Sequence, residues 1–242
     1  MVNERPGISP QVYARTGGFA YLIIIVAGAM GEIFIRQKII IQGNAIATTQ
    51  NISASPLLWR IGIFGDLVMH VFDLVLGLVY YTLFKRVNKS LALLSLLFGV
   101  IQTAVLVANK MNLMMPLFLL DDAHYLKAFD PQQLQALSYL SIKAHEYGFG
   151  VGLIFFGFEC LIDGYLIFKS EFLPRVLGVM IFIAGLCYLA NSFLLIFSPR
   201  LEDLLFPIIL GPLALIGEFS MCLWLIVKGV NVKKWGEIEK LQ

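Results

Sequence analysis

The sequence predicts an all-α, polytopic membrane protein, a bundle of about six transmembrane helices with both termini in the cytoplasm. Of its 242 residues, 59% are hydrophobic and only 14% are charged. A soluble domain has about half apolar and about a quarter charged residues. The mean hydropathy is +0.82, and the apolar residues are concentrated in long runs, which is the pattern of membrane spans.

A span needs roughly 20 apolar residues, so six helices use nearly the whole chain. Residues 1–242 are therefore expected to form a single transmembrane domain without a separate soluble unit. The predicted spans cover residues 17–35, 57–84, 90–117, 134–168, 173–197 and 204–227.

The distribution of Lys and Arg predicts the orientation. With the N-terminus inside, 11 of the 18 residues lie in cytoplasmic segments, Arg5 and Lys240 among them. This excess follows the positive-inside rule and predicts a multi-pass protein of the cell inner (cytoplasmic) membrane. The seven residues on the outer side are Arg36, Lys38, Arg60, Lys110, Lys127, Lys143 and Arg200.

The first apolar run resembles a signal peptide, because the small residues Ala27–Ala29 could be a cleavage site. The run continues to Ile35, however, and ends at the charged residues Arg36 and Lys38, as an uncleaved span does. An uncleaved first span is the favoured reading, and cleavage stays open.

Charge and cysteine usage exclude several classes of protein. A net charge of +2, without a basic patch, gives no indication of a nucleic-acid partner. Cys160, Cys187 and Cys222 lie within apolar runs, which indicates small buried side chains and not disulfides. No nucleophile stands in a recognisable triad, so the sequence offers no named reaction.

Three features predict local structure between or within the spans. The polar segment 42–56 is expected to be an exposed outer loop. Asp130, Pro131 and Gln133 form a typical helix start, with a capping residue, a first-turn proline and a capping-box glutamine. Pro212 is expected to kink the last helix two turns before Glu218.

Three carboxyl groups are predicted near the middle of the bilayer. Glu159 and Glu218 each precede an inner lysine by ten residues, which corresponds to about 15 Å of helix. Asp73 precedes Lys85 by twelve residues, about 18 Å. An ionised group at this depth costs about 2.5–3.5 kcal/mol. These carboxyls should therefore face the bundle and be protonated, share a proton or hold a cation.

A second group of polar residues is predicted nearer the outer face. Asp66, His70 and Asp73 are four and three residues apart and so share one helix face. Glu32, Asn109 and Asn191, with Gln102 and Lys110, reach similar depths. Together with the three midplane carboxyls they define a candidate pocket: Glu32, Asp66, His70, Asp73, Asn109, Glu159, Asn191 and Glu218.

Each of these groups has a functional and a structural interpretation. Asp66, His70 and Asp73 could bind a divalent metal, or could form a hydrogen-bonded seam between helices. Glu159, Glu218 and Asp73 could couple to protons or cations, or be protonated structural groups. Arg36, four residues after Glu32, gives that acid a simple structural partner.

Three further polar residues are expected to be superficial. His145 and Glu146 should lie at the outer surface of the protein, higher than the candidate pocket. Asp163 is close enough to the inner face to extend its carboxylate toward water.

Several stretches resemble a known family. They include 14–18, Arg60–Gly62 with Asp66, the glycine-rich run 147–157, the segment 172–178, and Gly217-Glu218 with 223–225. Over nearly its whole length the chain resembles the bacterial membrane family catalogued as domain of unknown function 4386. The resemblance implies a bacterial cytoplasmic membrane protein and brings no activity or catalytic residue with it.

Three functions stay open. The favoured one is a membrane binding or accessory protein with a polar intramembrane pocket, whose ligand is a small molecule, a lipid or a cation. The second is a proton- or cation-coupled small-molecule transporter that uses the midplane carboxylates. The third is a membrane-embedded enzyme, in one version dependent on a divalent metal at Asp66, His70 and Asp73.

Overall fold

A computed structural model of the chain describes residues 9–239. It contains six helices that are long and apolar enough to cross a membrane. The all-α polytopic bundle is thus confirmed, and each predicted span overlaps one of these helices. Arg5 and Lys240, counted above for orientation, lie outside the described residues. The six spans are Pro10–Ile39, Pro56–Phe84, Lys89–Leu119, Pro131–Lys169, Arg175–Phe197 and Pro199–Val227.

Two spans are interrupted by π-helical turns. The first consists of α1 (Pro10–Ala29), the π-helical η1 (Met30–Arg36) and the short α2 (Gln37–Ile39). The last consists of α8 (Pro199–Leu205), the π-helical η3 (Phe206–Leu210) and α9 (Gly211–Val227). The other spans are α4 (Pro56–Phe84), α5 (Lys89–Leu119), α6 (Pro131–Lys169) and α7 (Arg175–Phe197); α3 (Ala45–Ala54), the 3₁₀ turn η2 (His124–Ala128) and α10 (Val232–Glu239) connect or follow them.

Side-chain caps begin two of the long helices. The Asn88 side chain accepts a hydrogen bond from the amide of Leu91 at 3.0 Å, which starts α5 directly after a tight turn. Asp130 and Gln133 form the predicted capping box at the start of α6. Each cap supplies partners for amides that have no carbonyl within the helix, so these boundaries are encoded locally.

The prediction of a loop over 42–56 was wrong, because α3 occupies most of this segment. Asn44 caps the helix through a 2.9 Å bond from the amide of Ala47. The hydroxyl of Thr49 donates to the carbonyl of Ala45 at 2.8 Å, so this polar side chain is satisfied by its own helix. Thr49 and Ile52 are buried, and α3 packs on α6. The polar composition concealed a short packed helix.

The last span contains a π-helical turn next to Pro212, where the sequence predicted a kink. The π-helical turn η3 ends just before this proline, and the amide of Gly211 donates to the carbonyl of Phe206, five residues earlier. A proline in the first turn of α9 has no amide to donate, so a widened turn before it accommodates the missing bond.

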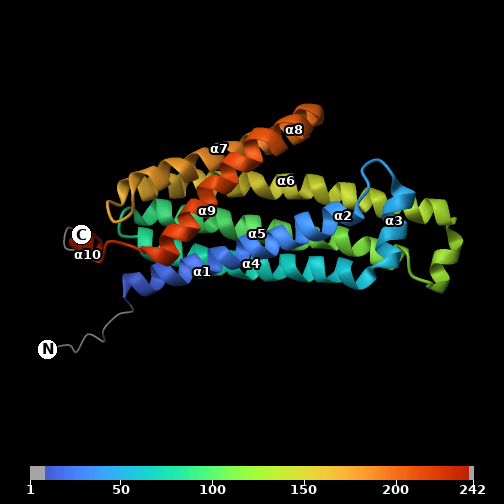
Figure 1. Cartoon of the computed structure of the whole chain (residues 1–242), viewed down its shortest axis with the longest axis horizontal. Helices are drawn as coiled ribbons and strands as arrows, with labels where there is room; N and C mark the ends of the chain where they lie inside the picture. The colour runs from blue at the N-terminus through green and yellow to red at the C-terminus, as the bar shows by residue number, and fades with distance from the viewer. Residues whose placement is uncertain (1–8, 240–242) are drawn as a thin grey trace.

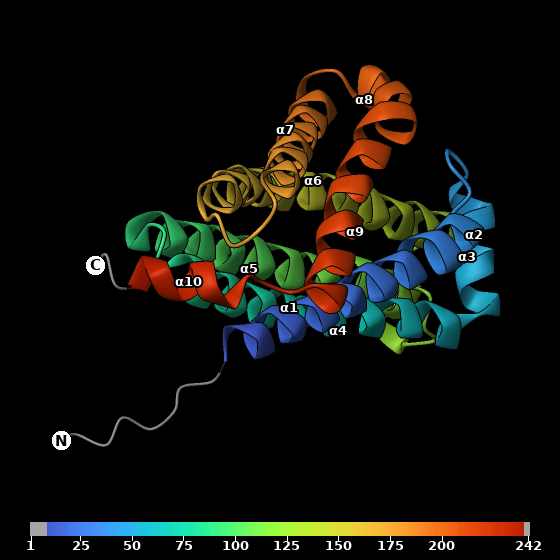
Figure 2. The ribbon, with the colours of Figure 1, turned by 60° about the vertical axis from the view of Figure 1, so that its left-hand side comes forward.

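The six spans form a closed ring. Each packs mainly against two others, in the order α1, α4, α5, α6, α7 and α9, and α9 returns to α1. Figure 2 shows the same bundle after a rotation, with α9 crossing from α7 to α1. Because the order around the ring follows the order along the chain, side chains from all six spans can meet on its axis.

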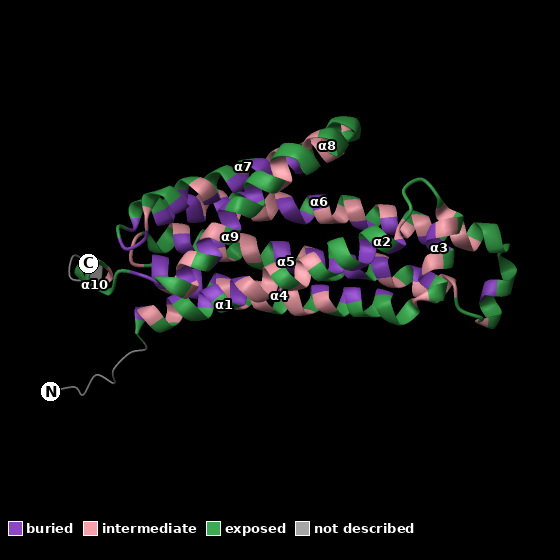
Figure 3. Cartoon of the chain, viewed as in Figure 1, coloured by how far each residue is buried: buried purple, intermediate pink, exposed green. Residues whose placement is uncertain are grey.

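The outer surface of the ring is apolar. Exposed residues recur along the helices of the bundle (Figure 3). On α4 they include the large apolar residues Phe64, Val71 and Leu78. Large apolar residues exposed in this density fit contact with lipid. The chain is a multi-pass membrane protein.

Helices α6 and α7 approach each other closely through pairs of glycines. A Cβ atom added to Gly164 would lie 2.7 Å from the carbonyl oxygen of Gly178. The same contact recurs between Gly157 and Gly185. Gly157 belongs to the glycine-rich run 147–157, and small residues of this kind let membrane helices pack backbone to backbone.

The two ends of the bundle differ. The start of α1 and helix α10 lie at one end, here called the terminal end (Figure 1). There an apolar cluster, the terminal plug, joins all six spans; it includes Tyr21, Leu83, Ala92, Leu166, Leu177 and Leu225. At the opposite end a second cluster with Ile35, Trp59, Leu113 and Ile142 joins η1, α4, α5 and α6. The hairpin of α7, α8 and α9 diverges from these helices (Figure 1).

Candidate functional site

An ion-pair layer crosses the half of the bundle opposite to the terminal end. Arg36, at the end of η1, holds Asp66 of α4 with two bonds, Nη1 to Oδ2 at 2.7 Å and Nη2 to Oδ1 at 3.2 Å. Lys110 of α5 approaches the same Oδ2 at 2.9 Å. Arg36 Nε donates to Glu32 Oε2 at 2.7 Å. We call Glu32, Arg36, Asp66 and Lys110 the ion-pair layer.

The ion-pair layer is internally satisfied. Asp66 is 0% exposed, Lys110 2% and Arg36 8%, while the Glu32 side chain is 56% exposed. A two-pronged guanidinium–carboxylate pair with a second cation gives the buried carboxylate strong partners. Two cations and two carboxylates balance, so the layer joins three spans without a net charge.

Backbone geometry supports this layer at Gly31. A Cβ atom at this position would lie 2.5 Å from Asp66 Oδ1 and 3.1 Å from Arg36 Nη2. Any other residue would therefore push the carboxylate or the guanidinium out of place. Gly31 belongs to η1, and π-helical turns are frequent at functional sites.

A neutral network lies beside the ion-pair layer. Asn109 Nδ2 contacts the Nδ1 atom and the carbonyl oxygen of His145, both at 2.9 Å. Asn112 donates to Asn109 Oδ1 at 2.9 Å. His145 is therefore buried, and its predicted place at the outer surface was wrong, because α6 turns this residue toward α5. Lys110 also lies over the ring of Phe149.

His70 and Asp73 form the next pair on α4. His70 Nδ1 and Asp73 Oδ2 are 2.9 Å apart, and the Nε2 atom of His70 is buried without a hydrogen-bond partner. Asp66 points instead to Arg36 and Lys110. Within residues 9–239, no three His, Cys, Asp or Glu side chains are placed to hold a metal ion together. The geometry therefore favours an ion pair over a divalent metal at Asp66.

A second polar layer lies closer to the terminal end, next to the terminal plug. Glu159 of α6 lies against Gly99 of α5, where an added Cβ atom would be 2.6 Å from Oε1. The Tyr188 hydroxyl of α7 donates to Glu218 Oε1 of α9 at 2.7 Å. Ser95 of α5 donates to Asp163 Oδ1 at 2.5 Å. Asp163 is buried, so its predicted extension toward water was wrong.

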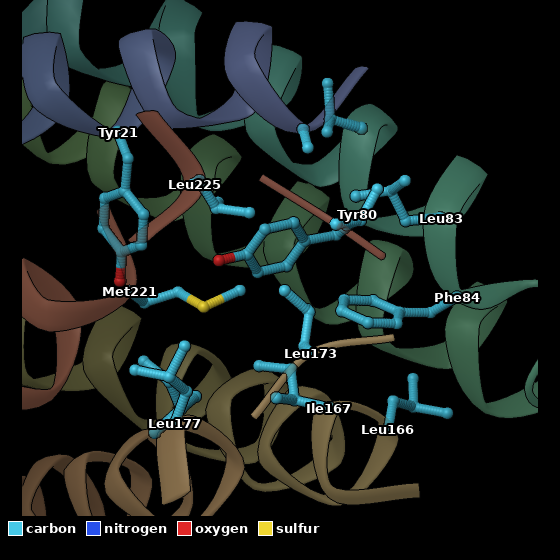
Figure 4. Packing of buried hydrophobic residues seen from close by; sticks show 14 of the residues in the cluster. Tyr21, Tyr80, Leu83, Phe84, Leu166, Ile167, Leu173, Leu177, Met221 and Leu225 are labelled. Atoms are coloured by element: carbon cyan, nitrogen blue, oxygen red, sulfur yellow. The ribbon is translucent and has the colours of Figure 1, made fainter. Parts of the chain in front are cut away.

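Tyrosines complete this layer. Tyr80 lies within electrostatic range of Asp163, Glu218 and Glu159, and Tyr21 within range of Glu218 and Tyr80. Figure 4 shows the Tyr80 hydroxyl directed toward the interior between α1 and α9. This oxygen is buried without a hydrogen-bond partner. The acidic–tyrosine layer comprises Tyr21, Asp73, Tyr80, Glu159, Asp163, Tyr188 and Glu218.

The acidic–tyrosine layer contains no lysine or arginine among its described residues. The charged neighbours of Glu159 are Asp163, Asp73 and Glu218. In the described part of the chain, no Lys or Arg lies within ion-pair distance of any acid in this layer. The Asp73 side chain is nonetheless 18% exposed, and Glu159 is only half-buried although it leans on α5. The layer is therefore not completely buried, and its acids need positive charge or protons.

A comparison with protein families identifies the relationship. The family model described as "Domain of unknown function (DUF4386)" matches residues 16–229. The chain belongs to the DUF4386 family. It is also similar to a protein from Archaeoglobus fulgidus, described as "Uncharacterized protein", with 27% identity over 167 residues, which is 69% of this chain and 83% of the relative. No solved structure matches.

The segment matched by the family model contains every residue of both layers. The structure divides the residues of the predicted pocket between these two layers, the network of His145 and a separate position. Glu32 and Asp66 belong to the ion-pair layer. Asp73, Glu159 and Glu218 come together in the acidic–tyrosine layer, and His70 joins it through Asp73. Asn109 belongs to the network with His145. Asn191 stands by itself, with a buried Oδ1 atom that has no hydrogen-bond partner.

Sequence reasoning missed several members of these layers. Tyr80 could have been found, because it is seven residues after Asp73 and so shares the inward face of α4. Arg36 was assigned to Glu32 but not to Asp66, since their pairing depends on the contact between η1 and α4. Tyr21 and Tyr188 carry no local signal, because aromatic residues at helical spacing are common in any span.

Proposed function

We propose that this DUF4386 protein is a membrane-embedded binding protein for a small organic cation, which the acidic–tyrosine layer receives. The observation that carries the proposal is that no described lysine or arginine pairs with any of the four carboxyl groups of this layer. An ionised carboxyl in the membrane interior costs about 2.5–3.5 kcal/mol even on a lenient scale. A bound cation offsets this cost where a structural lysine or arginine is lacking.

The side chains favour an organic cation over a compact metal ion. The carboxyls are spread over α4, α6 and α9, and no three of the described acids can ligate one ion. Tyrosine rings attract diffuse positive charge through their faces, an interaction of about 2 kcal/mol when desolvated. The unpartnered hydroxyl of Tyr80 adds a donor and an acceptor for a ligand. An amine or quaternary ammonium group uses both kinds of contact.

The ends of the bundle support access from one side. The terminal plug, which shares Tyr21 and Tyr80 with the layer, packs side chains from all six spans at the terminal end, whereas the hairpin of α7, α8 and α9 diverges at the other end (Figure 1). With both termini in the cytoplasm, as the positive charges predict, the end with the divergent hairpin faces outward. We therefore propose that the ligand enters from outside a cytoplasmic membrane.

A direct titration tests the proposal. The full chain in lipid nanodiscs is titrated with benzyltrimethylammonium, and binding is measured by calorimetry. Glu218→Gln and Glu159→Gln are each expected to bind at least tenfold more weakly, since contacts to charged groups contribute about 1.5–3 kcal/mol. The matched control is Glu146→Gln, which removes a carboxylate paired with Lys143 outside the layer.

Variants of Tyr80 distinguish binding at a specific site from general attraction of a cation to negative charge. Tyr80→Phe keeps the ring and is expected to weaken binding modestly, while Tyr80→Leu also removes the π face and should weaken it further. Equal affinities for the wild type and all the layer variants would overturn the proposal. A thermal unfolding curve for each variant shows that it has folded.

A proton-coupled carrier is the second candidate, and the divergence of the α7–α9 hairpin at the end opposite to the terminal end favours it. In many carriers one group of helices rocks against another around a site near the midplane. The carrier predicts accumulation of the labelled cation in vesicles under a proton gradient, and loss of this uptake in Glu159→Gln. Binding without gradient-driven uptake supports the binding protein instead.

A further inference from the structure

A separate cavity lies at the terminal end of the bundle, outside both polar layers. It forms where the loop between α6 and α7 meets the link between α9 and α10. Its volume is about 440 Å³, within the range of about 300–1,000 Å³ typical of small-ligand sites. Its lining residues are Glu171, Phe172, Leu173, Pro174, Arg175, Trp224, Asn231 and Lys234.

Hydrogen bonds hold the walls of this cavity in place. The Asn231 amide donates to the carbonyl of Phe172 at 3.0 Å, which ties the two connections together. The Asn231 side chain accepts from the amide of Lys234 at 3.1 Å and so caps α10. The indole of Trp224 donates to the carbonyl of Gly229 at 3.1 Å. The cavity is therefore preformed and does not depend on a ligand to shape it.

The charged lining has an excess of positive charge. Arg175 and Lys234 face one acid, Glu171. The closest approach of Arg175 to Glu171 is 4.0 Å, and both side chains are more than half exposed. Such a pair is weak, so both cations are available to an anionic ligand. The charge of this cavity is opposite to that of the acidic–tyrosine layer.

Aromatic and basic side chains place the cavity at the level of lipid headgroups. Lys85 lies over Tyr81, Lys169 over Tyr165, and Arg175 over Phe168. Rings of this kind mark a membrane–water interface. Helix α10 is seen nearly end-on in Figure 1 and lengthwise in Figure 2, so it crosses the direction of the spans. This orientation is that of an interfacial helix, which lies in the plane of the membrane surface.

We propose that this cavity binds the phosphate headgroup of an anionic membrane lipid, with Arg175 and Lys234 as the phosphate-binding side chains. Arginine and lysine are the residues that proteins use for phosphate. The bordering Trp224, which is half-buried, offers apolar contact to the glycerol and upper acyl chain. A phosphate joined to acyl chains gains both contacts, whereas free phosphate gains only the charge. The proposal is independent of the organic-cation site.

Lipid retention tests the assignment. The full chain is reconstituted with phosphatidylcholine and a minor share of phosphatidylglycerol, extracted, and analysed by native mass spectrometry. The wild type is expected to retain phosphatidylglycerol preferentially. Arg175→Gln and Lys234→Gln should each reduce this preference about fivefold, and the double variant roughly thirtyfold. Lys234→Arg should keep it.

Two further variants test whether the charge of this cavity determines lipid retention. Lys127→Gln removes an exposed lysine at the opposite end and should leave retention unchanged. Glu171→Gln removes the opposing acid and should strengthen it. Equal retention of both lipids by the wild type would overturn the proposal. So would saturable binding of inorganic phosphate that is lost in the double variant without any lipid preference, since it assigns the cavity to free phosphate.

Discussion

The ion-pair layer and the acidic–tyrosine layer both draw residues from the first span and from α4, yet their buried carboxyl groups have opposite kinds of charged neighbour. In the first, Asp66 is contacted by both Arg36 and Lys110. In the second, Glu159 has other carboxyls as its charged neighbours. A buried carboxylate with cationic partners joins helices. Removing one member of such a group leaves the remaining charges buried without compensation, which destabilises the protein. A carboxylate without such partners contributes little to holding the bundle together and is available to a ligand.

The largest expected effect is on Asp66. The neutral isostere Asp66→Asn leaves Arg36 and Lys110 buried without their shared anion, which should destabilise the protein by about 3–5 kcal/mol. Thermal or denaturant unfolding in detergent measures the change. Lys110→Met, which keeps the two bonds between Arg36 and Asp66, should cost less. If Asp66→Asn had the same unfolding midpoint as the wild type, the ion-pair layer would not stabilise the contacts between the spans.

The next effect is at Gly31. Gly31→Ala places a methyl group 2.5 Å from Asp66 Oδ1, and the displacement should cost about 1–3 kcal/mol. Gly65→Ala is the control, because its nearest neighbour would be 3.9 Å away. Equal unfolding midpoints for these two variants would contradict the close contact between η1 and α4.

A smaller effect is expected at Ser95. Ser95→Ala removes the hydroxyl that donates to Asp163, a loss of about 1 kcal/mol. Ser95→Thr retains the hydroxyl and serves as the comparison. A larger loss of stability than in Gly31→Ala would mean that the acidic–tyrosine layer also holds the helices together.

The smallest effect on stability is expected for Glu159→Gln and Glu218→Gln. Each replaces a carboxyl that lacks a cationic partner with a neutral group of the same shape, so the unfolding midpoint should stay constant or rise. Combined with the loss of cation binding, this separates the two layers. A destabilisation comparable to that of Asp66→Asn would remove the contrast between them.

Both layers combine residues that the sequence revealed with residues that it concealed. The spacing of Asp66, His70 and Asp73 placed them on one face of α4, and the distance from the inner lysines placed Glu159 and Glu218 at similar depth. His145 and Asp163 were assigned to surfaces, because helix length gives depth but not rotation. Only the contact of α6 with α5 shows that both residues point inward.

The sequence by itself determined the membrane-spanning helices, their number and the position of each acid along its helix. These follow from long apolar runs, local caps such as Asp130, and the constant rise of a helix. Tertiary structure decided which acids acquire a cation. Arg36 meets Asp66 because η1 packs on α4, while no described lysine or arginine reaches Glu159 or Glu218. Charge partners between spans depend on the rotation and order of helices in the ring, which local sequence does not encode.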